Sequence, residues 1–134
     1  MHTTTIEVRT GGRPQVHDLT RDCAAFVADS ADGLLSVFVP HATAGVAILE
    51  TGAGSDDDLL AALEELLPRD GRWRHHHGSP GHGRDHVLPA LVAPSITVPV
   101  VSGRLTLGTW QSICLVDTNV DNPVRTVRLS ILEG

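Results

Sequence analysis

The chain has 134 residues, of which 41% are hydrophobic and 19% charged, and these values are typical of one globular domain. Its 16 acidic residues outnumber its 10 basic residues, all of them arginine, and the formal net charge of −6 excludes the basic surface of a nucleic-acid-binding protein. The sequence has no signal-peptide pattern and no apolar run near the ~20 residues of a membrane span, so we expect a cytoplasmic protein without membrane contact.

The first part of the chain predicts two strands and a helix. Apolar and polar residues alternate over residues 3–9, as in a half-buried strand, and the pair Gly11-Gly12 favours a tight hairpin into a returning strand over residues 13–17. Asp18 or Thr20 can then cap a helix that continues to about residue 31.

Two β-rich segments follow, over residues 34–39 and 44–50. They are separated only by Pro40–Thr43. We therefore expect this short connection to lie at a strand end, where its side chains can face a cleft.

The middle of the chain predicts two helices. A stripe of leucines forms the apolar side of a helix that Pro68 ends, and the helix dipole explains Asp56 and Asp57 in its first turn better than a carboxylate metal site does. Asp85 can begin a second, short helix with His86 in its first turn.

From residue 95 onward the chain has the pattern of strands. The expected segments are residues 95–101, 104–107, 110–117 and 125–132. Connections of hairpin length favour antiparallel pairing. We therefore predict a single α+β domain over residues 1–134, with a mostly antiparallel β-sheet and a few short helices.

The two cysteines, Cys23 and Cys114, lie in apolar runs and lack the C-x-x-C spacing. Buried free thiols in a reducing compartment explain this pattern better than a disulfide bond does.

The segment Trp73–His86 holds five of the eight histidines within fourteen residues. It is internal and interrupted by Gly, Ser, Pro and Asp, unlike a polyhistidine tag. Neutral imidazole is the commonest metal ligand in proteins. In an extended H-H-H run neighbouring side chains point to opposite sides, so one or two of these three could share a centre.

His41, His75 and His86 come from three places in the chain and could converge on one divalent ion, Zn²⁺ or alternatively Mg²⁺. Three protein ligands and an open fourth position are typical of catalytic zinc. A single histidine is more often a surface or hydrogen-bonded residue, and we assign that role to three others. These are His2, His17 and His82.

Two further groups of polar residues could take part in chemistry. Glu50 follows an apolar strand and could be a general base for a metal-bound water, although a first solvated residue after a core strand would look the same. Arg104 and Gln111 lie in a glycine-containing segment that could form a pocket rim for an anion, or a hairpin with Trp110 as core filler.

Several motifs occur in order along most of the chain. They are P-H-A-T-A-G, I-L-E, D-x9-P, H-x10-H, G-R-L-T-L-G-T-W-Q-S-I and the late Arg125. Together they resemble the YjbQ family, whose members are known as secondary thiamine-phosphate synthases. The resemblance implies an α+β domain that assembles into a homotrimer, with a metal-binding pocket near the subunit interface.

The resemblance also implies roles for individual residues. The family histidines match His41, His75 and His86, which leaves His76, His77 and His82 as local additions. Glu50 and Arg125 match a family acid and a family arginine, and Asp117 stands where the family often has Glu. Leu49 and Ala53 replace an Asn and an Asp that family members usually carry, whereas Asp58 keeps the later acidic position.

The activity that the resemblance implies is condensation of an aminopyrimidine diphosphate with a thiazole phosphate, which yields thiamine phosphate and pyrophosphate. We therefore expect a metal-dependent enzyme that acts on a phosphorylated small molecule, with Glu50, Arg104, Gln111 and Arg125 as catalytic residues. The alternatives are a metal-dependent hydrolase of unknown substrate and a non-enzymatic trimer that binds a metal or a ligand.

Overall fold

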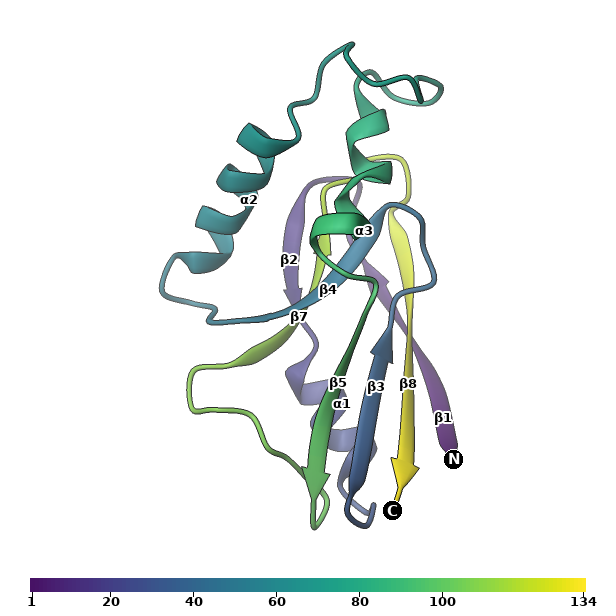
Figure 1. Cartoon of the computed structure of the whole chain (residues 1–134), viewed down its shortest axis with the longest axis vertical. Coiled ribbons are helices and arrows are strands. Elements are labelled where there is room, and N and C mark those ends of the chain that lie inside the picture. Colours follow the sequence, from purple (N-terminus) through teal and green to yellow (C-terminus); the bar gives the residue numbers. More distant parts are fainter.

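Eight β-strands in two sheets form the framework of the computed structural model, which describes residues 1–134 (Figure 1). The strands are β1 (His2–Arg9), β2 (Gln15–Asp18), β3 (Gly33–Phe38), β4 (Ala44–Leu49), β5 (Ser95–Val101), β6 (Arg104–Leu105), β7 (Ser112–Asp117) and β8 (Val124–Glu133). The helices are α1 (Thr20–Val27), α2 (Ser55–Leu66) and α3 (Leu88–Leu91), and a 3₁₀ turn, η1, spans His82–His86. None of the helices combines the length and apolar character that crossing a lipid bilayer requires.

The larger sheet has the strand order β1-β8-β3-β5-β6, and the smaller sheet has the order β2-β7-β4. Every neighbouring pair is antiparallel. The prediction of a single α+β domain with a mostly antiparallel sheet is therefore confirmed.

The main hydrophobic core lies between the two sheets and α1. Aliphatic side chains from β3, β5 and β8 meet those of β4 and β7, and Cys23 and Val27 of α1 complete the cluster. Burial of each large aliphatic side chain stabilises the fold by about 1.5–3 kcal/mol. Apolar residues alternate with other residues along β8, so that Val127, Leu129 and Ile131 face this core while the residues between them do not.

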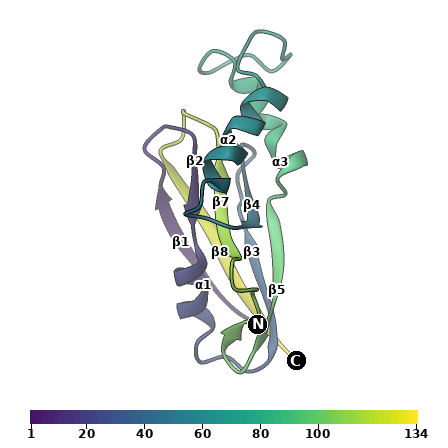
Figure 2. The same cartoon turned by 90° about the vertical axis from the view of Figure 1, so that its left-hand side faces the viewer.

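A second, smaller core joins α2 and α3 to the outer face of the smaller sheet. It comprises Leu63, Leu67, Leu88, Val92 and Val116. Strand β7 is consequently buried on both faces. The two views show α1 near the end of the molecule that carries both termini, and α2 and α3 toward the opposite end (Figures 1 and 2).

The predicted hairpin between the first two strands is wrong. Gly11 and Gly12 do have positive φ angles, of 66° and 72°, but β1 pairs with β8 whereas β2 pairs with β7. The turn therefore carries the chain from one sheet to the other. The two glycines correctly predict a turn. Which strands pair, however, is determined by the burial of residues that are distant in the sequence.

The predicted helices differ in length from those observed. α1 begins after Asp18, whose carboxylate accepts the Thr20 N–H at 2.8 Å, but it ends at Val27 instead of about residue 31. The backbone N–H of Ala31 donates instead to Glu133 at the end of β8. The helix expected from Asp85 is divided into η1 and the four-residue α3.

Trp110 is 73% exposed, so its interpretation as core filler is wrong. It lies on the connection between β6 and β7, and β6 itself has only two residues. The indole ring is therefore available to solvent or to another molecule.

Cys23 and Cys114 are both free and buried, as predicted. Burial raises the pKa of each thiol to about 12. Neither thiol is therefore a nucleophile at neutral pH.

Three segments that are distant in sequence meet at one end of the molecule: the β3–β4 connection, the β7–β8 connection and the segment before η1. β3 ends at Phe38 and β4 begins at Ala44, while β7 ends at Asp117 opposite Ala44 and β8 begins at Val124. Their connections lie beside the segment that leads into η1, at the end away from the termini (Figure 1). The polar residues of these connections are thereby brought together.

Two leucines of α2 test the importance of the second core. Leu63 is 3% exposed and Leu66 is 67% exposed. Leu63→Ala is expected to lower the free energy of unfolding by about 2–5 kcal/mol, because it leaves a cavity under the helix. The matched control Leu66→Ala should change it by about 0.5 kcal/mol or less in urea denaturation. Equal effects of the two changes would show that α2 does not depend on this core.

Candidate functional site

Glycines allow the histidine-rich segment to fold closely upon itself. A Cβ atom at Gly83 in η1 would lie 2.2 Å from the backbone oxygen of His75, and a Cβ at Gly78 would lie 2.7 Å from the ring of His82. Gly78 also has a positive φ of 83°. Any side chain at these positions would push the histidines apart, so the glycines bring η1 against His75.

Three histidines of this segment form a compact cluster. The ligand atoms of His75, His82 and His86 all lie within 4.8 Å of one another. Ring centroids are separated by 3.8 Å for His75 and His86, and by 5.0 Å for His75 and His82. The Nε2 atoms of His75 and His82 are buried and have no hydrogen-bond partner. Buried nitrogens without partners are costly unless a ligand satisfies them.

The electrostatics of the cluster favour the neutral form of His75 and His86. Burial lowers the pKa of His75 below its ordinary value of 6.5, and the neighbouring rings of His86 and His77 lower it further. Burial and the ring of His82 likewise lower the pKa of His86. Neutral imidazole is the form that binds metal ions, so the arrangement of these rings suits a cation.

One histidine of the cluster, His82, is anchored to another part of the chain. Its Nδ1 donates a hydrogen bond to Asp121 Oδ2 at 2.8 Å, and Ser79 Oγ donates to the same oxygen at 2.9 Å. The hydrogen bond from His82 is the main cause of a lowered pKa at Asp121. The histidine segment is thereby tied to the β7–β8 connection.

Two histidines of the cluster, His82 and His86, line a polar pocket of about 370 Å³. It is lined by Pro40, His41, Ala42, Thr43, His77, His82, His86, Asn119, Asn122 and Arg125. The expectation that the connection before β4 faces a cleft is confirmed.

His41 lies on the wall of this pocket but outside the compact cluster. Its Nε2 accepts a hydrogen bond from the backbone N–H of Thr126 at 2.9 Å. Burial, and then the positive charge of Arg125, lower the pKa of His41. A neutral ring whose Nε2 accepts a hydrogen bond carries its proton on Nδ1, so His41 offers an N–H donor rather than a lone pair.

Arg125 is the charged group of the pocket wall, and it is only 1% exposed. Its Nε and Nη2 donate to the two carboxylate oxygens of Asp117 at 2.7 and 3.0 Å, and Nη2 also donates to Thr43 Oγ1 at 2.8 Å. These bonds hold the guanidinium group rigidly and leave Nη1 as the nitrogen available to a ligand. A bidentate pair of this kind fixes the orientation of the arginine.

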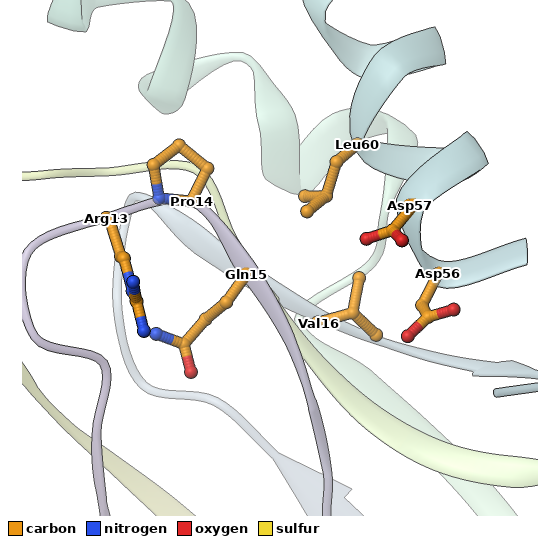
Figure 3. Close-up of a pocket in the computed structure, with 7 residues that line it drawn as sticks. All are labelled: Arg13, Pro14, Gln15, Val16, Asp56, Asp57 and Leu60. Atoms are coloured by element: carbon orange, nitrogen blue, oxygen red, sulfur yellow. The ribbon is translucent and has the colours of Figure 1, made fainter. Parts of the chain in front are cut away.

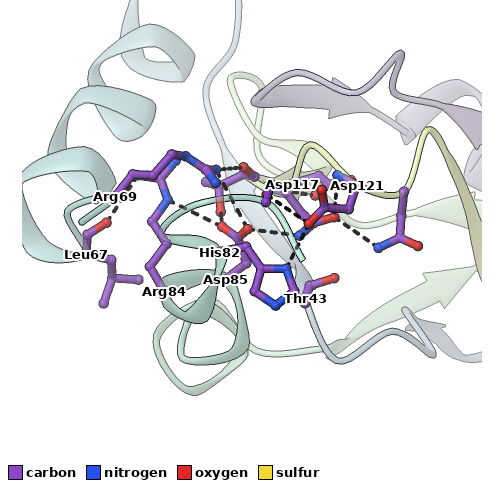
Figure 4. A network of polar contacts seen from close by, with 12 residues as sticks. Thr43, Leu67, Arg69, His82, Arg84, Asp85, Asp117 and Asp121 are labelled. Atoms are coloured by element: carbon purple, nitrogen blue, oxygen red, sulfur yellow. Dashed lines mark hydrogen bonds and ion pairs between the residues drawn. The ribbon is translucent and has the colours of Figure 1, made fainter. Parts of the chain in front are cut away.

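A buried polar network continues from the pocket toward α2 (Figure 4). Asp85, which is fully buried, accepts hydrogen bonds from Thr118 Oγ1 at 2.7 Å and from Asn119 Nδ2 at 2.9 Å. Arg69 and Arg84 lie beside the same carboxylate, at 3.7 and 3.4 Å, and supply positive charge. The backbone next to His86 is therefore fixed by a paired buried charge.

The other predicted catalytic residues lie elsewhere in the chain. Glu50 follows β4 at the end opposite His41, and a six-residue strand spans roughly 20 Å. Gln111 directly precedes Ser112, which pairs with Leu49, so it lies at the Glu50 end. Arg104 is in β6, which pairs with the end of β5 that lies next to Gly33. Of the four, only Arg125 shares a pocket with the histidines of the same chain.

A separate cavity of about 300 Å³ lies between the start of β2 and the first turn of α2 (Figure 3). Its walls are formed by Arg13, Pro14, Gln15, Val16, Asp56, Asp57 and Leu60. Asp56 and Asp57 occupy the first helical turn, as predicted, although no side chain makes a capping hydrogen bond there. This cavity contains no histidine, and we assign no chemistry to it.

His82 is the main residue whose position the sequence analysis missed. The sequence predicts a surface or hydrogen-bonded role for His82, and it does make a hydrogen bond, but it is only 7% exposed and belongs to the cluster. Two signals could have identified it. His82 and His86 are four residues apart in a turn, and a dense polar run, D-T-N-V-D-N, follows the buried strand β7.

Comparison with known proteins gives a consistent result across the chain. The family described as "UPF0047 protein YjbQ-like" matches residues 4–134. The chain is 63% identical to UPF0047 protein Rv2556c of Mycobacterium tuberculosis over 134 residues, which is all of both proteins. It is 34% identical to UPF0047 protein YugU of Bacillus subtilis over 115 residues, covering 81% of this chain and 83% of that protein.

Solved structures share the same fold. The hypothetical protein APE1520 from Aeropyrum pernix K1 superposes with a TM-score of 0.90 at 36% identity, covering 100% of both chains. A YbjQ-like protein of unknown function, SSO2532 from Sulfolobus solfataricus P2, gives a TM-score of 0.91 at 26% identity, covering 99% of this chain and 97% of the other.

Proposed function

We propose a function for this chain, which belongs to the YjbQ family, from the pocket that its histidines share with Arg125. The protein is a metal-dependent enzyme that acts on a phosphorylated small molecule. The observation that carries the proposal is a compact group of three imidazoles beside a rigid, buried guanidinium group.

The donor set fits a divalent ion of the zinc type. The proposed ligands are His75, His82 and His86, of which the first and last were expected from the sequence. His82 takes the place expected for His41, because the Nε2 of His41 already accepts the Thr126 N–H. Bound by three imidazoles, Zn²⁺ would supply Lewis-acid chemistry at an open coordination position, whereas Mg²⁺ prefers oxygen ligands.

The chain's own residues suit a phosphate group. Arg125 can donate from Nη1 to a phosphate oxygen without moving, because Asp117 and Thr43 hold its other nitrogens. His41 can donate from Nδ1 to a second oxygen or to a leaving group, and the amide of Asn122 lies on the same wall. These donors would stabilise negative charge that develops on a departing diphosphate.

The reaction proposed from the family resemblance is the condensation that forms thiamine phosphate. It releases pyrophosphate, and the donors of the pocket suit a leaving group of that kind. A hydrolase would also need a general base for water, but Asp85, Asp117 and Asp121 are all engaged in hydrogen bonds to the chain. Within a single chain, the position of these acids therefore favours transfer over hydrolysis.

We also propose that the chain forms a homotrimer in the cytoplasm. The outer face of the larger sheet leaves Leu34, Phe38 and Leu132 at least 40% exposed, and Trp110 is exposed on its own loop. In an assembly, Glu50 or Gln111 of one subunit could reach the pocket of another. Light scattering at micromolar concentration is expected to give three times the mass of the chain, and a monomer mass would contradict the proposal.

The proposed metal ligands can be tested one by one. Untagged wild-type protein is expected to hold about one Zn²⁺ per chain. Alanine at each proposed ligand should remove most of this metal while circular dichroism shows a folded protein. His41→Ala and His76→Ala are the matched controls and should keep it, as measured by elemental analysis. Loss of metal in His41→Ala with retention in His82→Ala would contradict this ligand set.

The role of Arg125 can be tested by binding of inorganic pyrophosphate. Arg125→Lys keeps the charge but loses the bidentate geometry, so the affinity should fall by about tenfold or more. Arg128→Lys is the control, because Arg128 is exposed on the same strand. Formation of thiamine phosphate from the two precursors should fall in Arg125→Lys only. Equal affinities in the two variants would remove Arg125 from substrate binding.

A further inference from the structure

We propose that Asp121 is the positioning residue that makes His82 a metal ligand. This inference rests on the proposed metal site, and it assigns a role to a carboxylate that does not itself touch the ion. Asp121 lies on the β7–β8 connection, outside the histidine-rich segment.

The hydrogen bond from His82 determines which ring nitrogen is free. Because Nδ1 donates to Asp121 Oδ2 at 2.8 Å, the neutral ring has its lone pair on Nε2. That Nε2 is buried and has no partner, and the ring of His82 lies 5.0 Å from that of His75 and 5.1 Å from that of His86, measured between centroids. A carboxylate behind a ligating imidazole fixes the tautomer and ring orientation, and raises the basicity of the nitrogen that binds the ion.

Asp121 is itself held in place from two directions. Its backbone N–H donates to Asn119 Oδ1 at 2.9 Å, and its carboxylate accepts the hydroxyl of Ser79. Asn119 is fully buried and donates through Nδ2 to Asp85, the neighbour of His86. One short connection therefore sets the relative positions of two of the proposed ligands.

The backbone at Gly78 leaves room for this pair. A Cβ atom at Gly78 would lie 2.7 Å from the His82 ring and 3.3 Å from Asp121 Oδ2. Glycine thus allows the ring and the carboxylate to meet. Asp121 is 32% exposed at its side chain, whereas His82 is 8% exposed, so the acid forms the solvent side of the pair.

The hydrogen bond between His82 and Asp121 could also serve only to hold two loops together. The experiment must therefore measure metal binding and not stability alone. Co²⁺ is the probe, because it replaces Zn²⁺ in sites of this type and its visible absorption reports the ligand geometry. Affinity is measured by competition with a chelator on the whole, untagged chain. Asp121→Ala is expected to weaken Co²⁺ binding by about 10–100-fold and to alter the absorption spectrum.

Two further variants make the test specific. Asp121→Asn keeps an acceptor oxygen for His82 and should recover part of the lost affinity, and it serves as the test if Asp121→Ala does not fold. Asp70→Ala is the matched control, because Asp70 is an exposed acid whose carboxylate pairs with Arg72 and not with a histidine. It should bind Co²⁺ as the wild type does.

A double-mutant cycle with His82→Ala identifies the route of the effect. Once His82 is absent, Asp121→Ala should cause no additional loss of affinity. If Asp121→Ala weakens Co²⁺ binding in the His82→Ala background as much as in the wild type, the proposal is overturned. It is also overturned if Asp121→Ala binds Co²⁺ with wild-type affinity. If Asp121→Ala does not fold, the same criterion applies to Asp121→Asn. If the wild type binds no Co²⁺, the proposed metal site fails together with this inference, whereas binding that is indifferent to Asp121 refutes the inference alone.

Discussion

The arrangement of this pocket depends on the hydrogen bonds of one buried residue, Asn119. Its Nδ2 donates to Asp85, its Oδ1 accepts from the backbone of Asp121, and its own backbone N–H donates to Asp117. A buried amide without partners would be destabilising, so these hydrogen bonds must form together. The connection after β7 is thereby held against three acids, Asp85, Asp117 and Asp121, and these acids in turn contact Arg125 and the histidine-rich segment.

This constraint joins two kinds of chemistry that are separate in the sequence. Asp117 orients Arg125 on β8, while Asp85 and Asp121 fix the backbone and one ring of the histidine-rich segment. Positive charge and neutral imidazoles therefore meet in one polar pocket, which is a suitable environment for a metal ion together with an anionic substrate. The main core lies below this end of the sheets and provides a rigid support for it.

Residue periodicity was enough to predict the strands and the α+β class, because alternation and leucine spacing reflect burial directly. Strand partners were not predictable in the same way, and β1 and β2 joined different sheets. Composition predicts a metal site in the histidine-rich segment, but it does not show that His82 hydrogen-bonds to Asp121, 39 residues away. Glu50 illustrates another limit: the predicted strand over residues 44–50 already places it at the opposite strand end from His41, and in the structure it lies outside the pocket of the histidines.

The central claim is that His75, His82 and His86 bind one divalent ion beside Arg125. Anomalous diffraction at the zinc absorption edge, from crystals of untagged protein grown with Zn²⁺, measures this most directly. The account predicts one strong peak per chain among these three rings, within about 2.0–2.1 Å of Nε2 of His82. A peak bound by His41 in place of His82, or no peak in this pocket, would contradict it.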